Sequence, residues 1–153
     1  MLSLVIPIFN EEKLIDELMR RTISALESFT SEYEVIFVDD GSTDLSLDMI
    51  LRYQKKNRKI KALSLSKNFG HQAAYTAGLE HAKGEIVAMM DGDLQDPPEL
   101  LSQMYSKIIK ENFDIVSGKK TGRKGNKGRN LSSILFHLFF RQISEVKNIE
   151  NSG

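Results

Sequence analysis

Two aspartates, Asp91 and Asp93, are separated by a single glycine, and this spacing has the clearest chemical meaning in the sequence. Side chains two positions apart in an extended segment point to the same side, so both carboxylates can bind one cation. Mg²⁺ and Mn²⁺ prefer oxygen ligands and commonly keep places for substrate phosphates. We therefore expect Mg²⁺ or Mn²⁺ here, neutralising a diphosphate as it departs.

Gly92 would leave a nucleotide room to approach the backbone. A simple turn is the competing explanation.

Three other polar segments lie earlier in the chain, and each follows a run of apolar residues. They are residues 7–12 (PIFNEE), 39–44 (DDGSTD) and 66–72 (SKNFGHQ). Each has a purely structural explanation, since Asn10 and Asp44 could cap helices and residues 39–41 could form a turn. Because chance does not readily place four polar segments in the same relation to apolar runs, the set favours one shared ligand site.

Several other kinds of active site are excluded by what the sequence lacks. It has no cysteine, which excludes disulfides, Cys-ligated zinc or iron–sulfur centres and thiol catalysis. It has no G-x-G-x-x-G after the first apolar run, no P-loop and no G-x-S-x-G elbow. The three histidines are scattered, so no histidine metal cluster is expected. His71 lies within a polar segment and is a candidate for substrate contact.

The overall composition is that of an ordinary globular protein, with 41% apolar and 27% charged residues. Lys and Arg together number 21, as do Asp and Glu, so no net charge points to a nucleic-acid partner. No apolar run approaches the roughly 20 residues that span a bilayer. No basic segment precedes the first apolar run, so we expect no signal peptide and a cytoplasmic location.

The elements that must position these residues follow from an alternation of short apolar runs and longer amphipathic stretches. We expect strands over residues 2–9, 33–38, 60–65, 85–90 and 113–116, and helices over 11–29, 44–56, 71–82 and 97–110. This alternation predicts an α/β domain with a mostly parallel sheet and helices on both faces. Ligands bind such sheets at the carboxyl ends of the strands, where the strand order reverses, and all four polar segments fall at these ends.

The last part of the chain has a different character. Residues 117–130 contain lysines, arginines and glycines but no acid, which predicts a mobile basic loop. Apolar residues then recur at helical spacing from Leu131 to Phe139. This helix could pack on the core, or it could lie at a membrane surface or lead into a membrane region.

Taken together, residues 7–12, 38–44, 68–70 and 91–99 resemble the family 2 glycosyltransferases of the GT-A fold. Within that family the chain is most similar to the polyprenyl-phosphate (dolichol-phosphate or undecaprenyl-phosphate) hexosyltransferases, over about residues 1–140. The resemblance implies a GT-A, nucleotide-diphospho-sugar transferase fold. It also implies inverting transfer of a hexose from a UDP- or GDP-sugar with Mg²⁺ or Mn²⁺. Members usually continue into C-terminal membrane helices, so we expect this chain to be truncated before them.

The resemblance also implies a role for each site residue. Asp40 would contact the base of the nucleotide, with Asp39 close by. The nucleotide-sugar site would comprise Pro7, Asn10, Glu11, Asp39, Asp40, Asn68, Gly70, Gln72 and Gly92. The metal ligands would be Asp91, Asp93 and Gln95. The catalytic set would be Asp91 and Asp93 with the acceptor-phosphate cations Lys120, Arg123 and Arg129. We therefore expect a nucleotide-sugar-binding catalytic domain over residues 1–117, and a basic acceptor loop with an amphipathic helix over 118–153.

The nature of the acceptor can be approached from charge. A hydroxyl acceptor needs a general base, whereas a phosphate acceptor is already anionic and needs cations. Residues 115–144 contain no Asp or Glu, and the basic loop supplies cations beside a helix that could rest on lipid. This favours a polyprenyl phosphate at the cytoplasmic face of a membrane.

Two other functions stay open. A family 2 enzyme could act on a sugar hydroxyl in cell-surface polysaccharide, with Asp96 or Glu99 as base. A receiver-type signalling module is disfavoured, since its acidic pair should follow the first strand, where residues 9–11 read Phe-Asn-Glu. The sequence does not name the sugar or choose UDP over GDP, and it leaves open whether the protein is a homo-oligomer.

Overall fold

The computed structural model describes residues 1–119. The elements in chain order are β1 (Leu2–Ile8), α1 (Ile15–Glu27), β2 (Tyr33–Asp39), α2 (Ser46–Lys56), β3 (Ile60–Ser64), α3 (His71–His81), β4 (Ile86–Met89), a 3₁₀ turn η1 (Pro98–Leu100) and α4 (Leu101–Glu111). The chain divides into a unit of Met1–Asp114, which contains all of these elements, and a second unit of Ile115–Gly153. The predictions for Lys120, Arg123, Arg129 and the helix over 131–139 lie outside the described residues.

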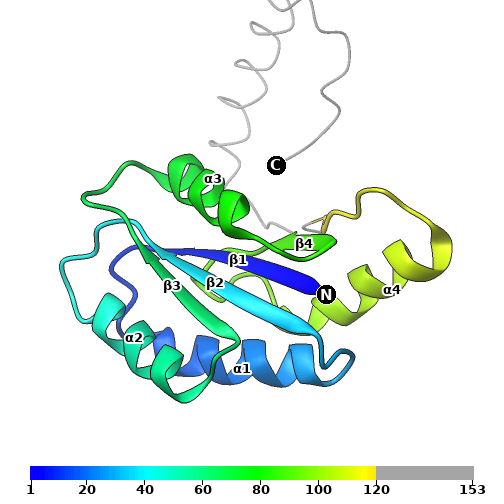
Figure 1. The fold of residues 1–153 in the computed structure, drawn as a ribbon, viewed down its shortest axis with the longest axis horizontal. Helices are drawn as coiled ribbons and strands as arrows, with labels where there is room; N and C mark the ends of the chain where they lie inside the picture. The colour runs from blue at the N-terminus through cyan, green and yellow to red at the C-terminus, as the bar shows by residue number, and fades with distance from the viewer. Residues whose placement is uncertain (120–153) are drawn as a thin grey trace, which may run out of the picture. The chain divides into compact units, whose positions relative to one another are not determined.

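The sheet has four strands in the order β3-β2-β1-β4, and every pair is parallel (Figure 1). β1 pairs with β2 from Leu2↔Tyr33 to Ile8↔Asp39, and with β4 on its other side. The chain therefore builds outward from β1 to β3 and then returns across β1 to place β4. The strand order reverses between β1 and β4, which makes this the expected ligand-binding position of the sheet.

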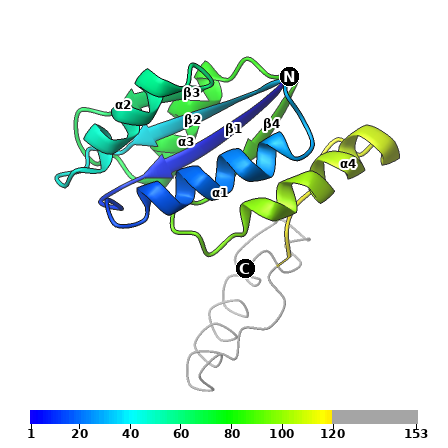
Figure 2. The ribbon, with the colours of Figure 1, turned by 90° about the horizontal axis from the view of Figure 1, so that it is seen from below.

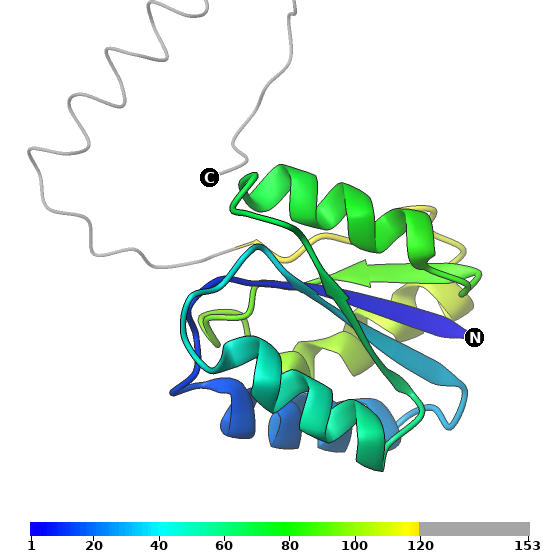
Figure 3. The same cartoon turned by 60° about the vertical axis from the view of Figure 1, so that its left-hand side comes forward.

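Both faces of the sheet are covered, which explains why β1 and β2 are mostly apolar and carry few polar residues, namely Ser3, Glu34 and Asp39. All seven residues of β1 are buried, and so are all seven of β2. Figure 3 shows α3 on one side of the sheet and α1 and α2 on the other. On the latter side, Leu4 and Ile6 of β1 belong to one apolar core with residues of α1, α2 and α4. Figure 2 shows α1 and α4 side by side on this face.

Helix α3 packs very closely on the opposite face. Val5 of β1 and Val38 of β2 form a second apolar core there with Ala74 of α3. A Cβ added to Gly78 would lie 2.3 Å from Cγ1 of Val5. Glycine at this position therefore lets the helix approach the strands, and the approach fixes where the first turn of α3 lies relative to the strand ends.

One predicted element is wrong. The apolar run over residues 113–116 is not a strand, although Phe113 and Ile115 are apolar; 50% and 84% of their surfaces are exposed. Helix α4 ends at Glu111, and the residue that follows it, Asn112, is in the left-handed conformation, with φ 58°. A strand needs a neighbouring strand to complete its hydrogen bonds, and none of the strands over residues 1–119 pairs with this run. An apolar composition alone therefore does not make a run of residues a strand when no strand is available to pair with it.

Over residues 1–119 no helix is both long enough and apolar enough to cross a bilayer.

Candidate active site

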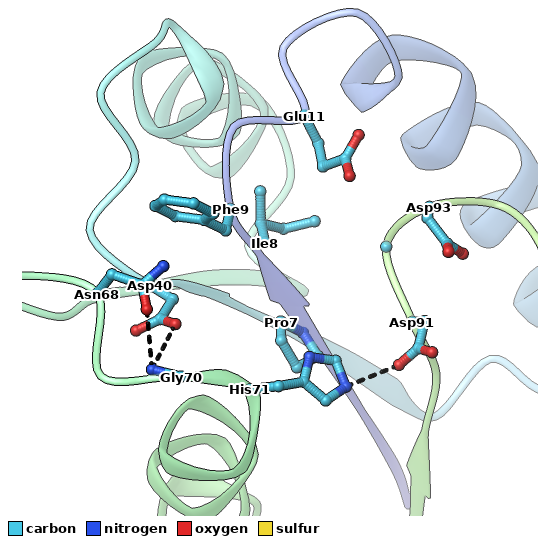
Figure 4. A pocket seen from close by; sticks show the side chains of 11 residues that line it. Pro7, Ile8, Phe9, Glu11, Asp40, Asn68, Gly70, His71, Asp91 and Asp93 are labelled. Atoms are coloured by element: carbon cyan, nitrogen blue, oxygen red, sulfur yellow. Dashed lines mark hydrogen bonds and ion pairs between the residues drawn. The ribbon is translucent and has the colours of Figure 1, made fainter. Parts of the chain in front are cut away.

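A pocket of about 320 Å³ opens at the carboxyl ends of the strands, beside the position where the strand order reverses. It is lined from all four strand ends (Figure 4): by Pro7 and Ile8 at the end of β1 and Phe9 and Glu11 after it, by Asp40 after β2, by Asn68, Gly70 and His71 after β3, and by Asp91, Gly92 and Asp93 after β4. The structure thus brings the four polar segments of the sequence into one place.

The pocket is acidic. Four carboxylic side chains line it, those of Glu11, Asp40, Asp91 and Asp93. The pKa of Glu11 is raised, first by its partial burial and then by the negative charges of Asp93 and Asp44. Carboxylates that converge in this way repel one another, so a cation or a set of hydrogen-bond donors must offset their charge.

A divalent cation fits the donor set of this pocket. Asp91 and Asp93 offer hard carboxylate oxygens, and no group of three or more His, Asp or Glu residues in the described part of the chain could enclose a metal. Two carboxylates leave most coordination positions open for water and phosphate oxygens, which is how Mg²⁺ is commonly held beside phosphorylated substrates.

Asp91 is held by the first turns of α3. Its Oδ1 lies 2.9 Å from Nε2 of His71 and accepts a hydrogen bond of 2.9 Å from the hydroxyl of Tyr75. Burial and the bond to Asp91 raise the pKa of Tyr75, so its hydroxyl stays a donor at neutral pH. Sequence reasoning missed Tyr75, which sits in an apolar helix. Its spacing of four residues from His71, on the same helix face, was the available signal.

Gly92 is explained by packing. A Cβ at this position would lie 2.9 Å from the carbonyl oxygen of Pro7 and 2.5 Å from Cδ1 of Ile8. The segment after β4 therefore lies directly against the end of β1, and only glycine permits this. The reason expected from the sequence, room for a nucleotide to approach the backbone, stays a prediction.

Asp40 and Asp39 have different surroundings. Both oxygens of Asp40 accept backbone N–H groups, from Phe69 at 2.8 Å and Gly70 at 3.0 Å, so this carboxylate fixes the loop between β3 and α3 while lining the pocket. Asp39 is buried and accepts the backbone N–H of Ser42 at 3.3 Å. Asp39 therefore shapes the turn after β2 and does not line the pocket.

Asn10 joins two loops. It is exposed, with φ 56°, and its Oδ1 accepts the backbone N–H of Thr43 at 2.8 Å. Its own N–H donates to Oγ of Ser42 at 3.0 Å. The helix-cap explanation for Asn10 is wrong, because α1 begins only at Ile15 and its N-cap is Leu14. Asp44 is not the N-cap of α2 either, since that residue is Leu45, but its Oδ1 accepts the N–H of Ser46, the first residue of α2, at 2.9 Å.

Three predicted site residues are exposed and lie outside the pocket lining, Asn10 after β1, Gln72 on α3 and Gln95 after β4. The backbone N–H of Gln95 donates to Oδ1 of Asp93 at 2.9 Å, so Gln95 helps to orient a predicted metal ligand. The roles expected of both glutamine side chains stay predictions.

Comparison with known proteins decides the family. A sequence model described as "Glycosyl transferase family 2" matches residues 3–152. The chain belongs to this family. The chain is 34% identical, over 141 residues, to the undecaprenyl-phosphate 4-deoxy-4-formamido-L-arabinose transferase of Salmonella choleraesuis (strain SC-B67), a match that covers 92% of this chain and 43% of that protein.

Solved structures of glycosyltransferases share the fold. The mannosyltransferase PcManGT from Pyrobaculum calidifontis, in complex with GDP-Man and Mn²⁺, matches 70% of this chain and 32% of its own, with 25% identity and a TM-score of 0.61. S. aureus TarS 1–349 in complex with UDP-GlcNAc matches 80% of this chain and 37% of its own, with 29% identity and a TM-score of 0.64. The predicted family and the predicted GT-A fold, a class of α/β fold, are confirmed. The chain spans less than half the length of the curated relatives it matches.

Proposed function

We propose that this chain carries the donor site of an inverting, metal-dependent glycosyltransferase that moves a hexose from a UDP- or GDP-sugar to a polyprenyl phosphate. The observation that carries the proposal is the acidic pocket at the switch between β1 and β4, with Asp91 and Asp93 on its β4 side (Figure 4). The names of the similar proteins support it: one acts on undecaprenyl phosphate, one was solved with GDP-Man and Mn²⁺, and one with UDP-GlcNAc.

In this proposal the chain's own residues divide the work of holding the donor. Asp91 and Asp93 hold Mg²⁺ or Mn²⁺, which when bound supplies positive charge against the departing diphosphate. Asp40 lies toward the base, and Pro7, Glu11 and Gly92 line the space between. The positive N-terminal end of α3 lies at the pocket, at His71, where it favours an anionic ligand.

The proposed acceptor follows from two observations on charge: residues 115–144 offer cations and no acid, and Glu99 before them is a poor base. Residues 115–144 contain no Asp or Glu, while Lys120, Arg123 and Arg129 offer cations for a phosphate group. A hydroxyl acceptor would instead need a base, and Glu99 is poorly suited to that task. Its carboxylate is bound by Arg21 at 2.9 and 2.8 Å, and this pairing lowers its pKa to about 2. We place the reaction at the cytoplasmic face of a membrane, where the lipid phosphate is accessible.

A transfer assay tests this function. The full chain is supplied with UDP- and GDP-hexoses, Mn²⁺ and either polyprenyl phosphate or a glycan acceptor. We expect hexose on the lipid phosphate, and a loss of about 10²- to 10³-fold in turnover for Asp93→Ala, because charge stabilisation at the leaving group is lost. Asp48→Ala, at an exposed position of α2, is the matched control. Transfer to glycan alone, or full turnover by Asp93→Ala, would contradict the proposal.

A further inference from the structure

Within residues 1–119, the recorded contacts to the carboxylate of Asp91 all meet the same oxygen. Both the Nε2 atom of His71 and the hydroxyl of Tyr75 contact Oδ1, each at 2.9 Å. For Oδ2, the structure of residues 1–119 records no hydrogen bond. Two donors on one oxygen fix the plane of the carboxylate and leave the lone pairs of the other oxygen available.

The two donors are neighbours on one helix. His71 and Tyr75 are four residues apart on α3, and their rings meet edge to face with centroids 4.7 Å apart. Tyr75 is only 8% exposed and packs in the core between α3 and the sheet, so its hydroxyl is placed by the fold. The other predicted carboxylate ligand is held differently, because Oδ1 of Asp93 accepts a backbone N–H from its own loop.

Tyr75 does not line the pocket, whereas His71 and Asp91 do. Any effect of the Tyr75 hydroxyl on a ligand must therefore pass through Asp91. Donors behind a metal ligand commonly set its orientation, and their removal lowers metal affinity about 10- to 100-fold.

We propose that Tyr75, together with His71, is a positioning residue that fixes Oδ1 of Asp91 and so presents Oδ2 to the divalent cation. This inference rests on the proposed function, because it needs a cation-dependent nucleotide site. If the inference holds, the buried hydroxyl of Tyr75 on α3 affects the affinity of the site for that cation.

The test compares Tyr75→Phe with wild type by calorimetric titration of Mn²⁺ into the full chain at saturating UDP or GDP. Nucleotide affinity is measured in parallel with EDTA. We expect Tyr75→Phe to weaken Mn²⁺ binding about tenfold and to leave nucleotide affinity in EDTA unchanged. Tyr53→Phe is the matched control, since its hydroxyl donates to Asp16 at 2.8 Å on the other face of the sheet, and it should bind Mn²⁺ like wild type.

A second variant keeps the test decisive if Tyr75→Phe does not fold. His71→Ala removes a side chain that is 52% exposed, and it should also weaken Mn²⁺ binding. Wild-type Mn²⁺ affinity in the folded variants, or an equal loss of nucleotide binding with and without Mn²⁺, would overturn the positioning role while leaving the proposed function intact. If wild type itself shows no Mn²⁺-dependent nucleotide binding, the proposed function fails and the inference fails with it.

Discussion

Single residues at the end of β4 carry both the chemistry and the packing of the pocket. Asp91 and Asp93 line the pocket, while Gly92 between them lies against the carbonyl oxygen of Pro7. The segment that carries the two carboxylates is thus packed directly against the end of β1 and cannot move closer to it. A change at Gly92 should therefore disturb the site without removing any group that does chemistry.

The substitution Gly92→Ala tests this link. Its Cβ would lie 2.9 Å from a backbone oxygen that cannot move aside without displacing β1, so the segment carrying Asp91 and Asp93 must shift. We expect a loss of about 1–3 kcal/mol in the free energy of unfolding, measured in urea, as is usual for overpacking. We also expect weaker binding of UDP or GDP in the presence of Mn²⁺. Unchanged stability together with unchanged binding would show that the contact is not real.

At this scale the sequence predicts which acids belong to the site but not what holds them. Glu11, Asp40, Asp91 and Asp93 all follow predicted strands, and parallel strands end at one edge, so their meeting could be foreseen. The spacing of Tyr75 from His71 places both side chains on one face of α3, but the hydrogen bond to Asp91 also depends on how far α3 turns and how closely it packs on β1. No sequence period encodes that distance.

Among the elements, η1 is tied to α1 by one ion pair. Arg21 of α1 binds both carboxylate oxygens of Glu99, which lies in η1 a few residues after the pocket acids. This pairing lowers the pKa of Glu99 to about 2. A carboxylate with a lowered pKa in the folded state stabilises the fold above its unfolded pKa. That contribution is lost as the pH falls from about 4.5 toward about 2.

We therefore expect Glu99→Gln to lower the melting temperature slightly at pH 7, because the pair is exposed and solvent screens it. The difference from wild type should shrink as the pH falls below about 4.5 and vanish near pH 2. Thermal melts across this range make the measurement, with Glu80→Gln at an exposed position of α3 as the control. A difference that persists unchanged at low pH would contradict the assigned ion pair.

Element types could be predicted where apolar period and length agree, as for β1, β2 and α2. Element types could not be predicted where the outcome depends on whether a neighbouring segment is available to pair with. Residues 113–116 are apolar enough for a strand but pair with none in the described part of the chain. The helix expected from Glu11 begins only at Ile15, and the N–H of Glu11 donates to Oγ of Ser46, the first residue of α2, at 2.8 Å.

At the scale of the whole molecule, the order of the strands in the sheet brings four separate loops together into one site. The βα alternation predicts a parallel sheet, but the order β3-β2-β1-β4 cannot be read from it, since periodicity does not say which strands pair. That order places β4 beside β1, and so brings Asp91 and Asp93 next to Pro7 and Glu11. The family 2 match over residues 3–152 agrees with this arrangement.

The most direct test of the donor site is a crystal structure of the chain grown with UDP or GDP and MnCl₂, with anomalous data collected for manganese. We predict one anomalous peak between the diphosphate and the carboxylates of Asp91 and Asp93, with the base toward Asp40. A nucleotide bound there without manganese, or manganese bound away from these two aspartates, would contradict the account.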